Sequence, residues 1–285
     1  MISLVFPGQG SQKVGMGYEL YEKFDYVKDI FKKADEILDY NISDIILNGP
    51  QEKINQTTFT QPAIYLVSYS ICEFLKKETK FFENNFSFFA GHSLGEYTAL
   101  TQAGAISFEQ GLLLLKNRAE AMQSAVPLGV GGMMAVLGAE IDHIENLIKE
   151  NFDKIKCFIA NDNSIGQLIL SGKNDELEKL SSLLKEKKIK YIKLPVSAPF
   201  HCELMRSATE RMETIINKQN FNTLNYKVVS NVTAKAYENI NEIKKLLIKQ
   251  IESPVRWRES IEYMISQGSS SFIEIGPGKV LSGLI

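Results

Sequence analysis

The segment FSFFAGHSLGEYTAL, residues 86–100, constrains the fold of this chain more than any other part of the sequence. An apolar run of strand length leads directly into Gly91-His92-Ser93-Leu94-Gly95, and residues that favour a helix follow. A serine between two glycines is typical of a sharp strand-to-helix turn in which the flanking chains approach too closely for side chains. The helix would direct its first N–H groups and the positive end of its dipole at the serine. A tight turn that only packs on a sheet is the alternative, but the strand before it and the helix after it favour an exposed nucleophile.

The elements on either side of this turn predict an α/β fold. Apolar runs predict strands at 2–6, 86–90, 226–231 and 270–276, and apolar spacing predicts helices at 26–38, 61–77, 94–103 and 107–125 and from about residue 202. Strands that alternate with helices are typical of a mostly parallel sheet. We therefore expect a large α/β-hydrolase-like domain, formed by residues 1–126 and 197–285.

The middle of the chain follows a different pattern. Residues 130–138 predict a strand, 141–152 a helix, 156–162 and 166–172 a hairpin across Asn163-Ser164, 174–188 a helix and 189–196 a strand. The order βαββαβ is that of the ferredoxin-like unit. We interpret residues 127–196 as a small ferredoxin-like subdomain inserted into the large domain.

Composition narrows the classes of protein to consider. The chain has 285 residues, 44% of them hydrophobic, and a formal net charge of −2, so nothing global indicates nucleic-acid binding. The three scattered cysteines Cys72, Cys157 and Cys202 argue against a disulfide framework and against a zinc site, and they indicate a reducing compartment. The N-terminus lacks the features of a signal peptide, and no apolar run approaches the roughly 20 residues that span a bilayer. We expect a cytoplasmic protein that does not contact a membrane, although a removed organellar transit peptide stays compatible with the sequence.

A serine nucleophile requires a base, and the three histidines of the chain can be compared directly. His92 is adjacent to Ser93, and neighbouring side chains leave a turn in different directions. His143 lies in an amphipathic helix between acidic neighbours, where we expect solvent exposure. His201, in SAPFH at the return from the small subdomain, is the remaining candidate. No acidic residue stands out as its orienting partner, so a backbone or amide carbonyl could orient it, which would give a dyad.

A second glycine-rich turn, FPGQGSQ at 6–12, lets backbone N–H groups point at one spot. Its spacing lacks the third glycine of the dinucleotide-binding fingerprint. An oxyanion hole fits better, with one N–H from Gln9 and one from Leu94, the residue after the nucleophile.

Arg118 follows a strongly apolar stretch, and the sequence leaves two interpretations of it open. It could form a surface ion pair with Glu109 or Glu120. It could also hold a substrate carboxylate in a bidentate clamp, which suits arginine better than lysine.

Five features follow one another along the chain in this order: FPGQGSQ, GHSLGEY, Arg118, SAPFH and GPGKVL. Together they resemble the malonyl-CoA:acyl carrier protein transacylases over essentially the whole chain. The resemblance implies that the enzyme moves malonyl from malonyl-CoA to the phosphopantetheine thiol of acyl carrier protein for fatty acid synthesis. It implies a ping-pong reaction through a malonyl-serine, a monomeric enzyme, no bound cofactor and no metal.

The same resemblance assigns roles to the catalytic residues. Ser93 would be the nucleophile and His201 the general base and acid. The main-chain carbonyl of Gln250 would support the histidine. Gln9 and Leu94 would supply the amides of the oxyanion hole.

Substrate binding and the C-terminus follow from the resemblance as well. Arg118 would pair with the malonyl carboxylate, Phe200 just before the histidine would favour malonyl, and His92 is placed among the substrate-binding residues. Family members usually carry a further short segment after GKVLSGLI, and the sequence leaves open whether the C-terminus is truncated.

An acidic carrier protein would dock on a basic patch. The candidates are two basic clusters: Lys185, Lys187, Lys188, Lys190 and Lys193 in the small subdomain, and Lys244, Lys245, Lys249, Arg256 and Arg258 around residue 250. Three other functions stay open. A free-standing acyltransferase of a polyketide pathway has the same chemistry, a serine esterase would lack the carboxylate clamp, and an acyl-binding module would form no covalent adduct at Ser93.

Overall fold

Two β-sheets organise the chain in a computed structural model that describes residues 1–285. Sheet A has four parallel strands in the order β7-β2-β1-β9, and they are β1 (Ile2–Phe6), β2 (Phe86–Gly91), β7 (Lys227–Val229) and β9 (Ser271–Glu274). The two faces of sheet A belong to different cores. Leu4 and Phe6 of β1 pack into the main core, whereas Val5 between them packs against Trp257. Coverage of both faces explains why these strands read as nearly continuous apolar runs.

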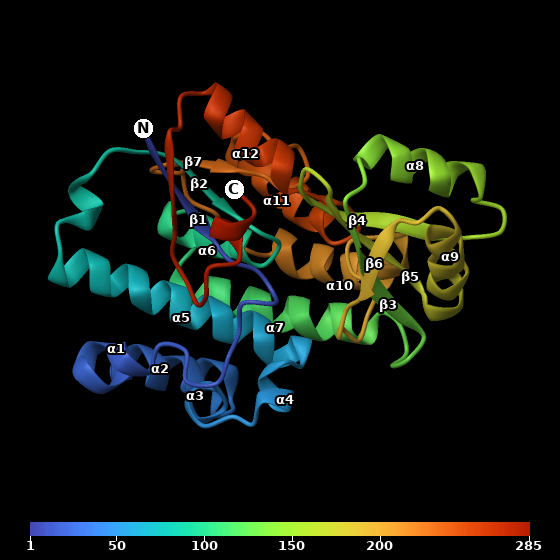
Figure 1. Ribbon diagram of the computed structural model, residues 1–285. Coiled ribbons are helices and arrows are strands. Elements are labelled where there is room, and N and C mark those ends of the chain that lie inside the picture. The colour runs from blue at the N-terminus through green and yellow to red at the C-terminus, as the bar shows by residue number, and fades with distance from the viewer.

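Helices cover both faces of sheet A (Figure 1). The long helices α5 (Thr57–Glu78) and α7 (Phe108–Ser124) pack together beneath the sheet, with α6 (Gly95–Gln102) against β2 and β1. The N-terminal helices lie outside this layer, and they are α1 (Tyr18–Lys23), α2 (Asp25–Leu38), α3 (Ile42–Leu47) and α4 (Gln51–Ile54). The remaining helices of this lobe are α10 (Arg206–Asn217), α11 (Ile240–Gln250) and α12 (Trp257–Ser266), with short 3-10 turns at Phe81–Glu83, Glu203–Met205 and Leu281–Gly283.

Sheet B forms the second lobe, at the right of Figure 1, in the order β6-β3-β5-β4-β8. Its strands are β3 (Gly131–Leu137), β4 (Cys157–Ser164), β5 (Gln167–Lys173), β6 (Lys190–Lys193) and β8 (Val255–Arg256). Side chains alternate along β3: Met134 and Val136 share a core with α8 (Ile141–Glu150) and α9 (Asn174–Glu186), while Met133 and Ala135 face the main core. The second face of sheet B therefore forms one wall of the space between the two lobes.

The structure confirms an α/β fold with a parallel sheet and a separate second sheet, and it corrects several boundaries. Helix α5 begins at Thr57 rather than at residue 61. Strand β4 continues through Asn163 and Ser164, so the predicted turn at these residues is wrong, and the chain reverses at Ile165 and Gly166 instead. Strand β6 ends at Lys193 rather than at residue 196. Helices α1, α3 and α4 and strand β8 were not predicted, because each has only two to six residues and too few positions to show a period.

None of the helices combines the length with the apolar composition that crossing a membrane requires.

Candidate active site

Ser93 lies in a strained turn between β2 and α6. Its φ angle is 53°, in the left-handed region that residues with side chains rarely adopt. The two glycines are required by close approach of the backbone. A Cβ on Gly91 would lie 1.9 Å from the carbonyl carbon of Gly95, and a Cβ on Gly95 would lie 2.2 Å from the carbonyl oxygen of Phe6. The turn therefore has the tight strand-to-helix geometry that the sequence predicts.

His201 is in hydrogen-bond contact with this serine. Its Nε2 lies 2.8 Å from Ser93 Oγ, and its Nδ1 lies 2.9 Å from the main-chain oxygen of Gln250. A carbonyl only accepts, so Nδ1 carries the hydrogen and Nε2 is left to accept from the serine hydroxyl. Burial, and next the Arg118 cation, lower the pKa of His201 to about 3. The imidazole is therefore neutral near pH 7, and no carboxylate is needed to orient it.

Arg118 lies in the same site, and its side chain is only 1% exposed. One terminal nitrogen donates to Gln61 Oε1 at 2.8 Å. The other donates to Ser93 Oγ at 3.0 Å and to Gln250 Oε1 at 2.9 Å. Burial lowers the pKa of Arg118, although an arginine keeps its charge at physiological pH.

The surface ion pair considered for Arg118 is wrong. Glu109 pairs with Lys33, and Glu120 pairs with Arg211 at 2.8 Å. Arg118 has no carboxylate within ion-pair distance. A buried guanidinium that contacts only neutral oxygens suits a ligand that brings a carboxylate.

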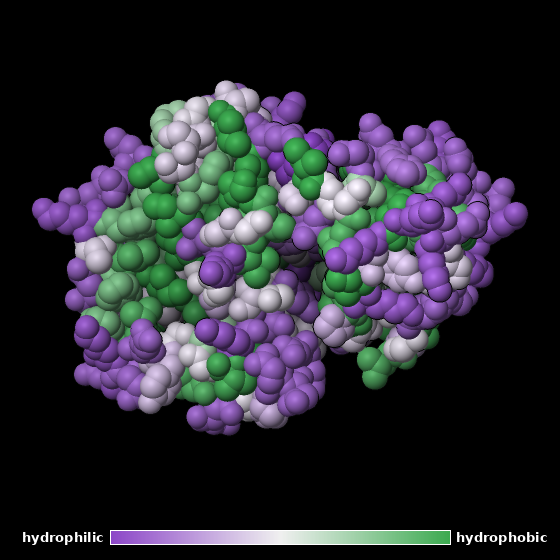
Figure 2. All heavy atoms as spheres, in the orientation of Figure 1, coloured by the Kyte–Doolittle hydropathy of each residue, from purple (hydrophilic) through white to green (hydrophobic).

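A cavity of about 180 Å³ opens over these residues between the two lobes, where Figure 2 shows a hollow. Gln9 and Leu94 both line it, and their backbone N–H groups donate to no acceptor in the protein. Phe200 lines the cavity beside other apolar side chains, namely Met122, Met133, Ile169, Leu194 and Val196.

His92 lines the cavity too but lies away from the serine hydroxyl. Its Nε2 is 2.9 Å from Asn163 Oδ1 and 3.3 Å from Asn161 Nδ2, and its ring lies 5.7 Å from that of Trp257. Burial lowers the pKa of His92. His143 is exposed on α8, as predicted.

Two residues that hold the turn were missed by sequence reasoning. Asn231 follows β7; its Oδ1 accepts from Ser93 N at 2.7 Å, and its Nδ2 donates to Gly91 O at 2.7 Å. Glu96 lies one helical turn after the serine and is completely buried. The sequence held a signal for Asn231, since polar residues that follow parallel strands meet at one edge of the sheet. Glu96 gave no such signal, because acidic residues are usual in the first turn of a helix.

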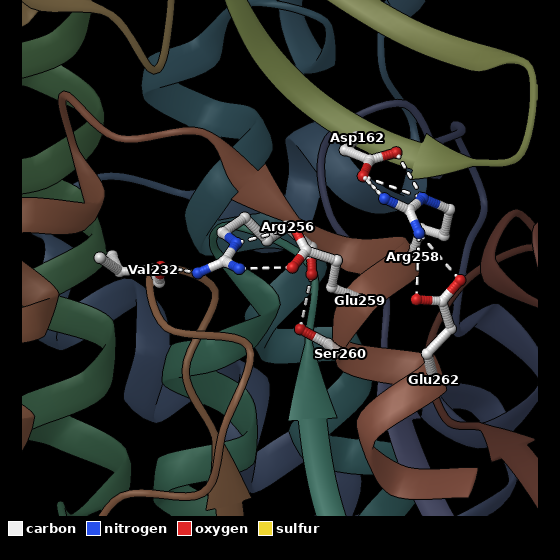
Figure 3. A network of polar contacts seen from close by, with 7 residues as sticks. All are labelled: Asp162, Val232, Arg256, Arg258, Glu259, Ser260 and Glu262. Carbon is white, nitrogen blue, oxygen red and sulfur yellow. Dashed lines mark hydrogen bonds and ion pairs between the residues drawn. The ribbon is translucent and has the colours of Figure 1, made fainter. Parts of the chain in front are cut away.

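The two arginines proposed for carrier-protein docking are already paired (Figure 3). Arg256 pairs with Glu259, and Arg258 contacts both Asp162 of β4, at 2.8 Å, and Glu262 of α12, also at 2.8 Å. Docking through the lysine clusters stays a prediction.

The fold and the matched family together define this protein as an acyltransferase. A family model described as "Acyl transferase domain" matches residues 3–283. The malonyl CoA-acyl carrier protein transacylase of Bacillus subtilis (strain 168) is 41% identical, with 100% of this chain and 89% of the relative covered. The polyketide biosynthesis malonyl CoA-acyl carrier protein transacylase PksC of the same strain is 42% identical, with 100% and 96% covered.

Solved structures agree. The malonyl CoA-acyl carrier protein transacylase of Clostridium perfringens is 42% identical with a TM-score of 0.93, over 99% of this chain and 88% of that one. A malonyl-transacylase solved in complex with its type II polyketide acyl carrier protein is 36% identical with a TM-score of 0.94, over 99% and 91%. This chain belongs to the malonyl CoA-acyl carrier protein transacylase family.

Proposed function

We propose that this enzyme transfers the malonyl group of malonyl-CoA to the phosphopantetheine thiol of acyl carrier protein through a malonyl-serine intermediate. One observation carries the proposal. Ser93 Oγ lies 2.8 Å from a neutral imidazole nitrogen and 3.0 Å from a buried guanidinium that has no carboxylate partner. A nucleophile, its base and a carboxylate-binding cation therefore meet at one oxygen. A malonyl thioester offers a carbonyl carbon to the nucleophile and a carboxylate to the cation.

In the first half-reaction, Ser93 Oγ attacks the thioester carbonyl carbon while His201 Nε2 takes the hydroxyl proton. The negative charge moves to the carbonyl oxygen, which accepts hydrogen bonds from the free N–H groups of Gln9 and Leu94. The C–S bond then breaks, and the thiolate of coenzyme A leaves with the proton from His201. The malonyl group remains on the serine as an oxygen ester.

In the second half-reaction, the phosphopantetheine thiol of the carrier protein takes the place of coenzyme A. His201 accepts the thiol proton, the sulfur attacks the ester carbonyl, and Ser93 leaves with the proton returned. A thioester is exchanged for a thioester, so the overall reaction is close to thermoneutral and runs in both directions.

Three further residues have supporting roles. The main-chain carbonyl of Gln250 holds the tautomer of His201 through a 2.9 Å hydrogen bond. Phe200 forms part of the apolar wall of the cavity, and His92 forms part of its polar wall next to the nucleophile. Both would contact the acyl group or the pantetheine arm.

We assign the product to fatty acid elongation. The alternative is a polyketide pathway, because the polyketide-named relative of Bacillus subtilis is 42% identical and the other transacylase of that strain 41%. The chemistry at the serine is the same in both pathways.

The proposal extends to domain organisation and cellular location. Residues 1–126 and 197–285 would form the large α/β-hydrolase-like domain, and 127–196 the ferredoxin-like subdomain. The order β6-β3-β5-β4, with antiparallel neighbours and a crossover helix after β3 and after β5, supports the ferredoxin-like description. Strand β8 of the large domain completes the second sheet, so the two units share backbone hydrogen bonds. Three free thiols support a reducing compartment, and we propose the cytoplasm.

The test is intact-protein mass spectrometry after brief exposure to malonyl-CoA and, separately, to acetyl-CoA. We expect a malonyl adduct on the wild type, none on Ser93→Ala and little on Arg118→Ala. Arg211→Ala is the matched control, because that arginine lies on the surface in an ion pair with Glu120. Absence of an adduct from either thioester on the wild type would overturn the proposed function. Added carrier protein should then remove the malonyl group.

A further inference from the structure

Glu96 is a completely buried carboxylate directly beneath the nucleophile turn. Three donors reach it: the Tyr237 hydroxyl at Oε1, the Asn231 N–H at Oε2 (3.2 Å) and the Gln250 side-chain amide at Oε2 (2.6 Å). No cation lies within ion-pair distance. Burial raises the pKa of Glu96 to about 7, and the hydrogen bonds from Tyr237, Gln250 and Asn231 oppose this shift. An unpaired buried carboxylate is costly, so its retention here needs a reason.

Gln250 connects this carboxylate to the reacting groups. Its Nε2 donates to Glu96 at 2.6 Å and to Ser93 O at 3.0 Å, while its Oε1 accepts from Arg118 at 2.9 Å. Its main-chain oxygen accepts from His201 at 2.9 Å. A carboxylate can only accept and a guanidinium can only donate. These two neighbours therefore allow only one orientation of the amide between them.

Asn231 gives Glu96 a second connection to the site. The carboxylate accepts from Asn231 N, and the side chain of Asn231 then holds both ends of the nucleophile turn, at Ser93 N and Gly91 O. Glu96 thus contacts both residues that fix the serine, the histidine and the arginine, yet it touches none of the reacting atoms itself.

We propose that Glu96 is a positioning residue for malonyl transfer. Its negative charge fixes the orientation of the Gln250 amide, and the amide in turn presents Arg118 to the substrate carboxylate and supports His201. Glu96 and Arg118 are an opposite-charge pair separated by one polarised amide. The arginine is thereby held in place without a direct ion pair to an internal carboxylate, so its charge stays available to the carboxylate of the substrate. The inference rests on the proposed function, because its effect is on the selection of malonyl.

The test compares malonyl and acetyl loading at pH 8, where Glu96 is ionised. Glu96→Gln keeps the shape of the side chain and removes the charge, so the orientation of the Gln250 amide is then held mainly by Arg118 and Ser93 O. We expect malonyl loading to fall by roughly tenfold, with a raised KM for malonyl-CoA, because about 1.4 kcal/mol of positioning is lost. Acetyl loading should fall less, because acetyl has no carboxylate for Arg118. The malonyl-to-acetyl ratio is the readout that a role in folding alone would not change.

A double-mutant cycle shows whether Glu96 acts through Gln250. Gln250→Ala removes the amide and keeps the main-chain carbonyl that holds His201. In that background Glu96→Gln should change the malonyl-to-acetyl ratio no further.

Glu213→Gln on α10, an exposed glutamate outside every ion pair, is the matched control and should load like the wild type. Tyr237→Phe removes one donor to Glu96 and serves if Glu96→Gln does not fold, with a smaller change in the same direction expected.

The outcomes separate the two claims. A wild type that takes up no malonyl ends the proposed function. Two results would overturn the positioning role while the function stands, provided that the wild type takes up malonyl. One is a folded Glu96→Gln variant with the malonyl-to-acetyl ratio of the wild type. The other is a double-mutant cycle in which the effects of the two substitutions simply add. An unchanged ratio in Tyr237→Phe would overturn it in the same way.

Discussion

The surroundings of His201, the proposed base, oppose its protonation. Burial and Arg118 lower its pKa to about 3, so the acid limb of kcat/KM for malonyl-CoA should lie below pH 6.5. If Arg118 binds the malonyl carboxylate as proposed, that carboxylate cancels part of the effect of the cation and raises the pKa of His201 in the enzyme–substrate complex. We therefore expect the acid limb of kcat to lie at higher pH than that of kcat/KM. With acetyl-CoA the two limbs should coincide, and a separation of the same size there would contradict the role of Arg118.

The role proposed for Arg118 depends on the geometry of its side chain as well as on its charge. Its two terminal nitrogens donate to Gln61, Ser93 and Gln250 at once, and lysine cannot reproduce this fork. We expect Arg118→Lys to lower kcat/KM for malonyl-CoA by roughly ten- to a hundredfold, which corresponds to the loss of about one hydrogen bond to a charged group. Steady-state kinetics measure the loss. Arg211→Lys on the surface should change nothing, and near-wild-type kinetics of Arg118→Lys would show that a point charge is enough.

At the scale of elements, the junction of β1, β2 and α6 leaves no room for a side chain. A Cβ on Gly95 would lie 2.2 Å from the Phe6 carbonyl oxygen, which belongs to the backbone of a central strand and cannot move cheaply. We expect Gly95→Ala to lower the free energy of unfolding by about 3 kcal/mol or more, the size of a severe core clash, and to abolish acylation. Denaturant unfolding measures the first effect and mass spectrometry the second. Gly283→Ala, where a Cβ meets open space, should be close to neutral.

The elements that the sequence predicts are those with enough residues to show a period. The predicted bounds of strand β2 and helix α7 agree with the structure nearly to the residue, and a capping box between Ser107 and Gln110 fixes the start of α7. Strand β8 has two residues and exists only because β4 offers it an edge, which no local pattern contains. The prediction of a turn at Asn163 failed because both residues of the pair favour turns, while pairing with β5 extended the strand.

The candidate site divides in a similar way. Ser93 and His201 could be found because a short motif and the scarcity of histidines single them out. Asn231 lies next to the serine only after β7 packs beside β2. Glu96 is close to the serine in the sequence, but its partners Asn231, Tyr237 and Gln250 reach it only through tertiary contacts. Arg118 could not be distinguished from a surface arginine until its burial was known.

At the scale of the whole molecule, Glu96 should affect stability with a definite sign. Its folded-state pKa of about 7 lies above the ordinary 4.5, so the folded protein binds more protons than the unfolded chain between these values. Its contribution to stability is therefore present at pH 4.5 and is lost as the pH rises through 7. Glu96→Gln has no carboxyl that titrates at this position, so it does not lose this stability. The difference in melting temperature, variant minus wild type, should therefore be larger at pH 8 than at pH 5. Thermal unfolding at both pH values checks the difference, and equal differences would contradict the raised pKa.

The two lobes are joined beside the site by an ion pair whose carboxylate is buried and whose arginine is partly exposed (Figure 3). Asp162 of β4 has a side chain only 3% exposed, and Arg258 of α12 contacts both of its oxygens, at 3.0 and 3.2 Å through Nε and at 2.8 Å through a terminal nitrogen. Removing one partner of such a pair leaves the other charge buried. We expect Arg258→Met to cost about 3 kcal/mol of unfolding free energy. Arg256→Met, on the same surface but in a more exposed pair with Glu259, should cost less than about 1 kcal/mol.

The same ion pair should affect the function of the site, because Asp162 lies between Asn161 and Asn163, which contact His92 at the cavity wall. If Arg258 fixes β4, its removal lets these two amides move, and the KM for malonyl-CoA should rise while Ser93 keeps its contact with His201.

The loss of stability in Arg258→Met should also depend on pH. Burial already raises the pKa of Asp162, and without Arg258 the carboxyl would protonate more readily, so the variant should lose less stability at pH 5 than at pH 8. Calorimetry at both pH values, with kinetics on the same samples, checks both effects. An Arg258→Met enzyme with unchanged stability and KM would show that backbone pairing of β4 with β8 is enough to join the lobes.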